Sequence, residues 1–344
     1  MISIRNIEEA QKETCEKFIS EYGFQSFLQS WAWGNFQKSL AREIFRLGIY
    51  EDESLVGLSL LVLEKSKFAT FLYCPAGPIF RYWKIETFSE WASFATQLGR
   101  EKKASFIRID PRKLPDQSEE ILKKSKFIEA AEYVQPKCTG VIDLTKTEEE
   151  LRGKMSPSTR NNVNAASRKG VVVREGRAEE IATFLDLLHQ TAKRKGLVLP
   201  SEKSYHEAQF EALNKEGLMK LYIAETKSDV LGASLVNFYA GTAYYMHAAN
   251  SLSQPHLRAS YPLVWHTILE AKKEGLKTFD FWGVAATDNP KDPWAGVTSF
   301  KFSFGANRVC FPPPYDLPLK PTYTLIRFTE HLRKPLRKIL RFRQ

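Results

Sequence analysis

Several features are missing from this sequence, and each absence narrows the classes of protein it can belong to. No run of 18 apolar residues is present, so we expect no membrane-spanning helix. Residues 1–5 lack the apolar core of a signal peptide, so we expect the chain to stay in the cytoplasm. The six histidines show no ligand spacing, so no metal is expected. No serine or cysteine lies in a recognisable nucleophile motif, so no covalent intermediate is suggested.

Cysteine is scarce and scattered. The four cysteines form no CxxC pair; they are Cys15, Cys74, Cys138 and Cys310. In a chain expected in the cytoplasm, this spacing favours reduced and mostly buried thiols.

The bulk composition is that of a soluble globular protein, with 43% hydrophobic and 26% charged residues. A length of 344 residues suits two domains of about 150 residues each better than one core. The net charge of +10 indicates an anionic partner such as nucleic acid, a phosphorylated ligand or anionic lipid. Many soluble proteins are equally basic without such a partner, so charge alone decides nothing.

Hydrophobic periodicity predicts the same order of elements twice: helices, a meander of strands, then a helix and a strand. In the first half the predicted elements are helices 8–22, 31–38 and 86–103 and strands 45–50, 55–63, 68–73 and 104–109. In the second half they are helices 157–169, 181–195, 204–217 and 261–275 and strands 218–226, 230–239, 242–248 and 277–283. We therefore predict an α+β chain of two tandem domains. The first comprises residues 1–145 and a returning segment, 317–344, and the second comprises residues 146–316.

Lys301 lies among four nearby aromatic residues, which are Trp294, Phe300, Phe302 and Phe304. A lysine in such a run is costly to bury unless it meets an anion. We therefore expect negative charge, permanent or transient, near Lys301.

The stretch Asp280-Phe281-Trp282-Gly283, a loop, and then Phe300-Lys301-x-x-Phe304-Gly305 resembles the C-terminal signature of the FemABX aminoacyltransferases. Further stretches are similar to family patterns: Gln29 to Lys38, Tyr73 to Pro78, and Gly170 to Val173. The resemblance runs over nearly the whole chain. These enzymes add amino acids from aminoacyl-tRNA to the peptidoglycan stem peptide.

The resemblance implies two tandem GNAT-like domains, here without the long coiled-coil arm that some members carry. It implies no cofactor, with aminoacyl-tRNA as co-substrate. The implied acceptor is UDP-MurNAc-pentapeptide or lipid II, and the sequence leaves both open.

Site residues are carried over from the same resemblance. Lys38, on a helix face with Trp31, would contact a phosphate of the acceptor, although a solvated lysine at a helix end is the plain alternative. Arg194 and Tyr205 resemble positions near the acceptor's phosphates. The remaining candidate substrate-binding residues are aromatic: Tyr245, Phe300 and Phe304.

The implied reaction is attack of a primary amine on an aminoacyl ester. Asp110, at the carboxyl end of a predicted strand, is the candidate to position the amine and take its proton, although Asp-Pro is also a common turn. Desolvation of the amine is the other way to lower its pKa. Lys301 is the candidate to stabilise the tetrahedral oxyanion.

The tail, residues 331–344, holds six basic residues and no acidic one, and we predict a helix broken at Pro335. It suits contact with tRNA or with anionic lipid at the inner face of the membrane, or it is a frayed terminus.

Two rival functions stay open. One is an acyl-CoA N-acyltransferase, disfavoured because residues 253–260 contain no glycine to cradle a pyrophosphate. The other is a non-enzymatic nucleic-acid or membrane-surface binder.

Overall fold

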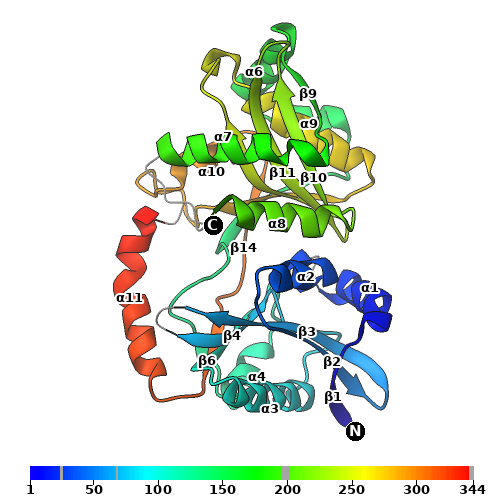
Figure 1. The fold of residues 1–344 in the computed structure, drawn as a ribbon, viewed down its shortest axis with the longest axis vertical. Helices are drawn as coiled ribbons and strands as arrows, with labels where there is room; N and C mark the ends of the chain where they lie inside the picture. The colour runs from blue at the N-terminus through cyan, green and yellow to red at the C-terminus, as the bar shows by residue number, and fades with distance from the viewer. Residues whose placement is uncertain (24–25, 67–68, 195–201, 341–344) are drawn as a thin grey trace. The chain divides into compact units, whose positions relative to one another are not determined.

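The computed structural model describes residues 1–23, 26–66, 69–194 and 202–340, without the side chains of 194, 202–204 and 333–340. It divides the chain into two compact units (Figure 1). Unit 1 contains residues 1–137 and 311–337, and unit 2 contains residues 138–310 and 338–344.

Unit 1 is built on a sheet with the strand order β1-β2-β3-β4-β6-β15-β7, and β5 pairs with β3 beside this path. Its strands are β1 (Ile2–Asn6), β2 (Ile44–Glu51), β3 (Ser54–Lys65), β4 (Thr70–Pro75), β5 (Ile79–Phe80), β6 (Phe106–Asp110), β7 (Ile128–Glu129) and β15 (Tyr315–Pro318). Its helices are α1 (Lys12–Tyr22), α2 (Trp31–Ser39), α3 (Ile85–Glu101), α4 (Ser118–Lys124) and α11 (Tyr323–Leu340). Strands β2 and β3 form a hairpin, because their antiparallel pairing runs to Glu51 and Ser54.

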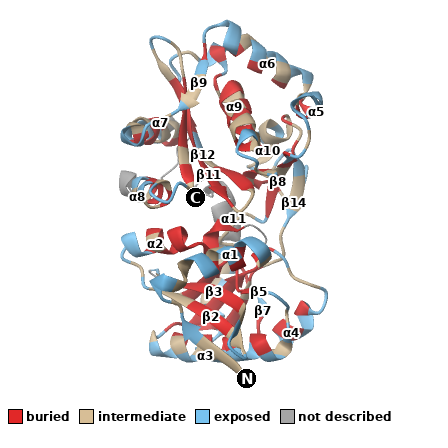
Figure 2. Ribbon diagram, turned by 90° about the vertical axis from the view of Figure 1, so that its right-hand side faces the viewer, coloured by how far each residue is buried: buried red, intermediate tan, exposed pale blue. Residues whose placement is uncertain are grey.

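Within the described part of unit 1, the one parallel pairing joins β4 to β6, and α3 forms the crossover that such a pairing requires. In Figure 1, α1 and α2 cover one face of this sheet, and α3 and α4 cover the other. The α3 side is the apolar core, where Phe88 and Trp91 are fully buried against strand residues such as Leu47 and Ile107. Figure 2 shows this burial concentrated in the strands.

Unit 2 repeats the scheme with the strand order β14-β8-β13-β12-β11-β10-β9. Its strands are β8 (Cys138–Asp143), β9 (Val172–Glu175), β10 (Met219–Glu225), β11 (Val230–Tyr239), β12 (Thr242–Asn250), β13 (Thr278–Val284) and β14 (Asn307–Cys310). Its helices are α5 (Glu148–Lys154), α6 (Pro157–Arg168), α7 (Ile181–Arg194), α8 (Glu202–Asn214), α9 (Ser260–Lys273) and α10 (Ala295–Phe302). Again one pairing is parallel, between β12 and β13, with α9 as its crossover. Helices α7 and α8 lie on one side of the sheet, and α6, α9 and α10 on the other (Figure 2).

Helix starts follow their capping signals. Thr147 and Glu150 form a capping box at the start of α5. Ser156 caps α6, which has Pro157 in its first turn. Ser30 caps α2 by accepting a hydrogen bond from the Trp33 amide at 3.1 Å.

The predicted domain boundary at 145/146 is wrong by one strand. We assigned residues 137–144 to the first half, but β8 pairs with β13 and β14 and therefore belongs to unit 2. Conversely, β15 begins at Tyr315, before the predicted return at residue 317, and pairs with β6 and β7 of unit 1. The sheet of unit 1 thus takes β15 from the far side of unit 2, and in chain order the sheet of unit 2 begins with β8; hydrophobic periodicity reveals neither pairing.

Arg108 on β6 ties the returning segment into unit 1. Its guanidinium is 2% exposed and donates to both carboxylate oxygens of Asp316, each at 2.7 Å. It also donates to Glu330 on α11, at 2.9 Å. The Tyr323 hydroxyl donates to the same Asp316 carboxylate at 2.9 Å. A buried cation is tolerable only with such partners, so β15 and α11 complete this unit.

Two further expectations are corrected. Cys138 and Cys310 form a disulfide between β8 and β14, while Cys15 and Cys74 are free and buried as expected. The two bonded cysteines are register partners in that antiparallel pair although 172 residues separate them in sequence. Helix α11 continues through Pro335 to Leu340 rather than breaking there.

Among the described residues, no helix is long and apolar enough to cross a membrane. The same part of the chain contains no group of three metal-ligating side chains that could hold a metal ion.

Candidate active site

The two parallel strands of unit 2 separate partway along their length. Strands β12 and β13 pair only at residues 242–244 with 278–280, yet β12 continues to Asn250 and β13 to Val284. Backbone groups beyond this point need partners other than the neighbouring parallel strand. This opening is where we locate the candidate site.

Lys301 lies on α10, and its side chain reaches the part of β13 that is no longer paired with β12. Its Nζ donates a hydrogen bond to the Gly283 carbonyl near the end of β13, at 2.8 Å. Burial lowers the pKa of Lys301 to about 8, and the nearby Asp280 carboxylate acts in the opposite direction. The predicted negative charge near Lys301 is therefore present as Asp280, although the direct hydrogen bond goes to a carbonyl. An ammonium held in this way has further N–H donors for an oxygen that becomes negative.

Asp280 is itself fixed by the strand around it. It is 7% exposed and accepts hydrogen bonds from the Trp282 amide, at 2.7 Å, and from the Thr139 hydroxyl of β8. The pairing of β13 with β8 is irregular between Asp280 and Gly283, and Trp282 has a left-handed φ of 62°. Such a backbone is unusual for a bulky residue and is found where local geometry serves function.

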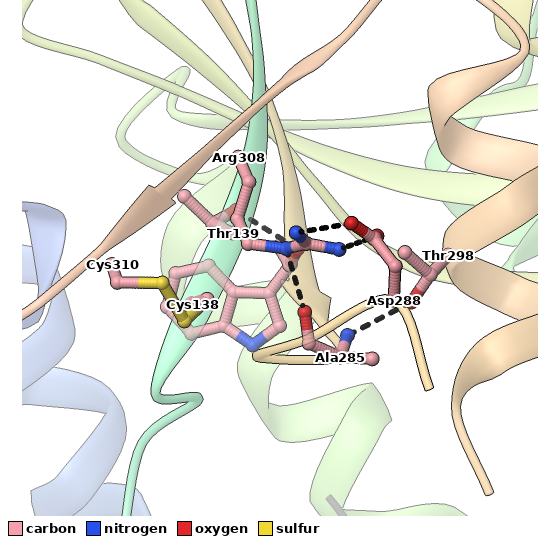
Figure 3. The surroundings of a disulfide bond; sticks show 8 residues. Cys138, Thr139, Ala285, Asp288, Thr298, Arg308 and Cys310 are labelled. Atoms are coloured by element: carbon pink, nitrogen blue, oxygen red, sulfur yellow. Dashed lines mark hydrogen bonds and ion pairs between the residues drawn. A yellow bond between two sulfur atoms is a disulfide. The ribbon is translucent and has the colours of Figure 1, made fainter. Parts of the chain in front are cut away.

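The loop that follows β13 is held from two sides, as Figure 3 shows. Arg308 on β14 donates to the Ala285 carbonyl at 2.9 Å and pairs with Asp288. From α10, the Thr298 hydroxyl accepts a hydrogen bond from the Ala285 amide at 2.8 Å. The Cys138–Cys310 disulfide joins the same two strands that carry Thr139 and Arg308. The surroundings of Lys301 are therefore preorganised.

The predicted aromatic residues are mainly packing groups. Phe304 is 2% exposed and Tyr245 is 6% exposed, and both belong to the core of unit 2. Phe300 is half-buried and meets Tyr261 and Phe304 edge to face. All three are part of the core of unit 2 or pack against it, and direct contact with substrate stays a prediction for each.

Asp110 ends β6 in unit 1. It is 3% exposed and accepts a hydrogen bond from the Tyr73 hydroxyl at 2.9 Å. Burial raises the pKa of this carboxyl, while the Arg112 charge and the Tyr73 hydroxyl lower it in part. A carboxyl group poised in this way is suited to proton transfer.

The other predicted residues are distributed over separate elements. Lys38 is exposed in the last turn of α2, whereas Trp31 is 4% exposed and lies under the Arg46 guanidinium, 3.9 Å from its ring. Tyr205 is half-buried on α8 beside His206. Arg194 ends α7, and its side chain lies outside the described residues. Of the two predicted catalytic residues, Lys301 belongs to unit 2 and Asp110 to unit 1.

The sequence reasoning missed Thr139 and the direct role of Asp280 beside Lys301. It also missed Asn237 on β11, whose side chain is fully buried and, within the described residues, has no partner for either polar atom. Asp280 lies between Phe279 and Phe281 on a strand. A charged residue between two aromatic residues could have indicated from the sequence that it faces different surroundings from its neighbours.

Comparison with known proteins gives the same architecture. The crystal structure of FemX superposes with a TM-score of 0.84 at 19% identity, covering 94% of this chain and 100% of that one. A tandem GNAT protein of the clavulanic acid pathway superposes with a TM-score of 0.58 at 13% identity, covering 93% and 99%. The lipid II:glycine glycyltransferase of Staphylococcus epidermidis is 22% identical over 366 residues, covering 84% of this chain and 87% of that protein.

The two similar units have the fold of FemX and of tandem GNAT proteins. The family model described as FemAB family matches residues 10–130, 124–229 and 204–331. The chain belongs to the FemAB family. It is an aminoacyltransferase, of the type that adds amino acids to a peptidoglycan precursor. The predicted fold class and family are thereby confirmed.

Proposed function

We propose that this enzyme transfers an aminoacyl group from aminoacyl-tRNA to the primary amine of a peptidoglycan stem peptide, with lipid II as the form of the acceptor. The amine nitrogen bonds to the ester carbonyl carbon, and the ester C–O bond breaks. The 3′-terminal ribose oxygen of the tRNA leaves and takes a proton, while the amine loses one. The reaction therefore takes place in the cytoplasm, where aminoacyl-tRNA is found.

The observation that carries this proposal is the Lys301 ammonium held on the Gly283 carbonyl, in the part of β13 that runs beyond its pairing with β12. The tetrahedral oxyanion forms only during transfer, so a fixed ammonium beside it lowers the barrier without tightening substrate binding. Lipid II is supported as acceptor by the name of the Staphylococcus epidermidis relative.

Asp110 is proposed to receive the acceptor's ammonium and then its proton. Its burial, which raises the pKa of the carboxyl group, and the hydrogen bond from Tyr73, which fixes its position, support a role in taking up a proton. The proposed roles of Lys38, Arg194 and Tyr205 in holding the acceptor's phosphates rest on the family resemblance alone.

The start of α9 argues against acyl-CoA as donor. GNAT enzymes that use acyl-CoA bind its pyrophosphate with backbone amides at a helix start, and such binding needs free N–H groups. Here α9 begins Ser260-Tyr261-Pro262, and proline has no N–H. No glycine precedes it within residues 253–260.

The test is a transfer assay with purified enzyme. A panel of labelled aminoacyl-tRNAs is offered with lipid II, with UDP-MurNAc-pentapeptide, and with no acceptor, and acetyl-CoA replaces tRNA in a parallel series. We expect label to move from one or a few aminoacyl-tRNAs to lipid II. Transfer from acetyl-CoA alone, or no transfer from any aminoacyl-tRNA, would overturn the proposal. Preference for the nucleotide-linked acceptor would correct the acceptor and leave the donor standing.

A further inference from the structure

Helix α11 is anchored to unit 1 along one side only. Tyr323 is 4% exposed and donates to Asp316, Glu330 pairs with Arg108, and Arg327 donates to the Glu129 carbonyl. These residues recur at the spacing of one helix face. The orientation of the helix is therefore set, and its opposite side must face outward.

The outward side of α11 is apolar. Leu325 is 67% exposed, Phe328 is 59% exposed and Leu332 is 58% exposed, at helical spacings of three and four residues. The other exposed large apolar side chains of the described residues, such as Tyr82 and Leu252, lie elsewhere in the sequence and are not in such a row. Contiguous exposed apolar surface marks an interaction site, whereas single exposed residues need no explanation.

The charges of this segment are almost all positive. Glu330 is the only acidic residue of α11, and Arg108 already neutralises it. The sequence that continues from Leu332 adds six basic residues and no acidic one up to Gln344. In that same sequence Leu336 and Ile339 follow Leu332 at spacings of four and three, so the apolar spacing is maintained.

We propose that the Leu325–Phe328–Leu332 face of α11 docks on the surface of an anionic lipid bilayer. A helix with a leucine and phenylalanine face and a lysine- and arginine-rich remainder lies in the membrane interface, with its apolar face among the acyl chains. The basic residues add attraction to anionic headgroups. tRNA would satisfy the charge but offers no apolar surface to bury this row, so the row favours lipid over RNA.

Docking would bring the enzyme to a lipid-linked acceptor, and in this respect the inference rests on the proposed function. Binding to vesicles, however, requires no substrate and is measured independently of transfer. Failure of one proposal can therefore be told from failure of the other.

The experiment measures co-sedimentation of the full chain with vesicles of phosphatidylcholine alone and of phosphatidylcholine with phosphatidylglycerol. Three proteins are compared: the wild type, Leu325→Ser/Phe328→Ser, and the control Tyr82→Ser/Leu252→Ser. The control removes two equally exposed apolar side chains from other parts of the surface. We expect the wild type and the control to bind anionic vesicles, and the α11 variant to bind at least about tenfold more weakly.

Activity provides a second readout. With lipid II in vesicles the α11 variant should lose transfer, while with lipid II dispersed in detergent, where no bilayer has to be bound, it should match the wild type. Equal vesicle binding by the α11 variant and the wild type, or no binding of the wild type to anionic vesicles, would overturn the inference. A variant that keeps vesicle binding but loses affinity for tRNA would assign this face to RNA instead.

Discussion

The two units share an order of strands but treat their single parallel pairing differently. In unit 1, β4 and β6 stay paired to their ends, through Pro75 and Asp110. In unit 2, β12 and β13 part after Tyr244 and Asp280. The first pairing ends at the buried carboxyl group of Asp110, and the second ends three residues before the Gly283 carbonyl that binds the Lys301 ammonium. The same strand pair is therefore followed by a candidate carboxyl group in one unit and by a candidate ammonium in the other.

The largest expected effect comes from removing the ammonium of unit 2. Lys301→Met should lower kcat/KM for transfer by roughly 100- to 1,000-fold, the cost of one lost oxyanion donor. Its Tm should not fall, because the variant no longer buries a charge. Lys277→Met, which removes an exposed lysine next to β13, is the control and should retain activity. Full activity of Lys301→Met would show that the opening is not the site of chemistry.

The next largest effect is expected from the carboxyl group of unit 1. Asp110→Asn keeps an acceptor for the Tyr73 hydroxyl but loses the base, so kcat/KM for the acceptor should fall about 100-fold. Steady-state kinetics with the acceptor varied at saturating aminoacyl-tRNA measure this. Asp116→Asn, at an exposed position six residues on, is the control. If both variants transfer normally, unit 1 contributes binding or stability but no proton transfer.

The pH dependence of the transfer rate tests whether Lys301 must be charged. The pKa of Lys301 is about 8 in the folded chain against an ordinary 10.5. The active ammonium is therefore lost as pH rises through about 8, and the rate should fall about tenfold for each further pH unit. Lys301→Arg, whose guanidinium stays charged, should lack this descending limb. A limb at pH 8 that persists in Lys301→Arg would belong to another group.

The lowered pKa of Lys301 also makes the free energy of unfolding depend on pH, and proton linkage gives the sign of this dependence. Between about pH 8 and 10.5 the unfolded chain binds the proton that folded Lys301 releases. The contribution of Lys301 to the free energy of unfolding therefore rises with pH across this window. Lys301→Met should show a shallower rise there, as measured by denaturant titration at several pH values.

The smallest effects test two buried amides. In unit 1, Gln29 is satisfied, since it accepts from the Leu60 amide at 2.7 Å and donates to the Pro75 carbonyl. In unit 2, neither polar atom of the Asn237 side chain has a partner among the described residues. Gln29→Leu should therefore lower the free energy of unfolding by about 2 kcal/mol, and Asn237→Leu should raise it by about 1 kcal/mol. Shifts of the same sign, measured by chemical denaturation, would show that the two amides are equivalent.

The sequence predicted most of the helices and strands because their signals are local. Capping residues such as Ser30, Thr147 and Ser156 mark helix starts, and alternating residues mark strands such as β2 and β13. Both units could be anticipated from the repeated order of these elements. What it could not predict is the exact pairing of distant segments: β8 belongs to unit 2 and not to unit 1, and Cys138 meets Cys310 across 172 residues.

The sequence likewise indicated some residues of the candidate site and not others. Lys301 stood out because a cation in an aromatic run is energetically unusual, and its inward position supports that reasoning. Tyr245 and Phe304 were named for the same aromatic character, but aromatic residues in a core look identical in sequence to those in a binding wall. Thr139 went unnoticed because nothing near it in sequence indicates that β8 will lie beside β13.

The late arrival of β15 has a consequence for how the molecule is made on the ribosome. Arg108 is buried with Asp316 and Glu330, which are translated more than 200 residues later. Until then the nascent first unit lacks a strand between β6 and β7 and contains a cation without its counterions. Unit 1, although it is first in the chain, is therefore expected to complete its folding only after the whole of unit 2 has emerged.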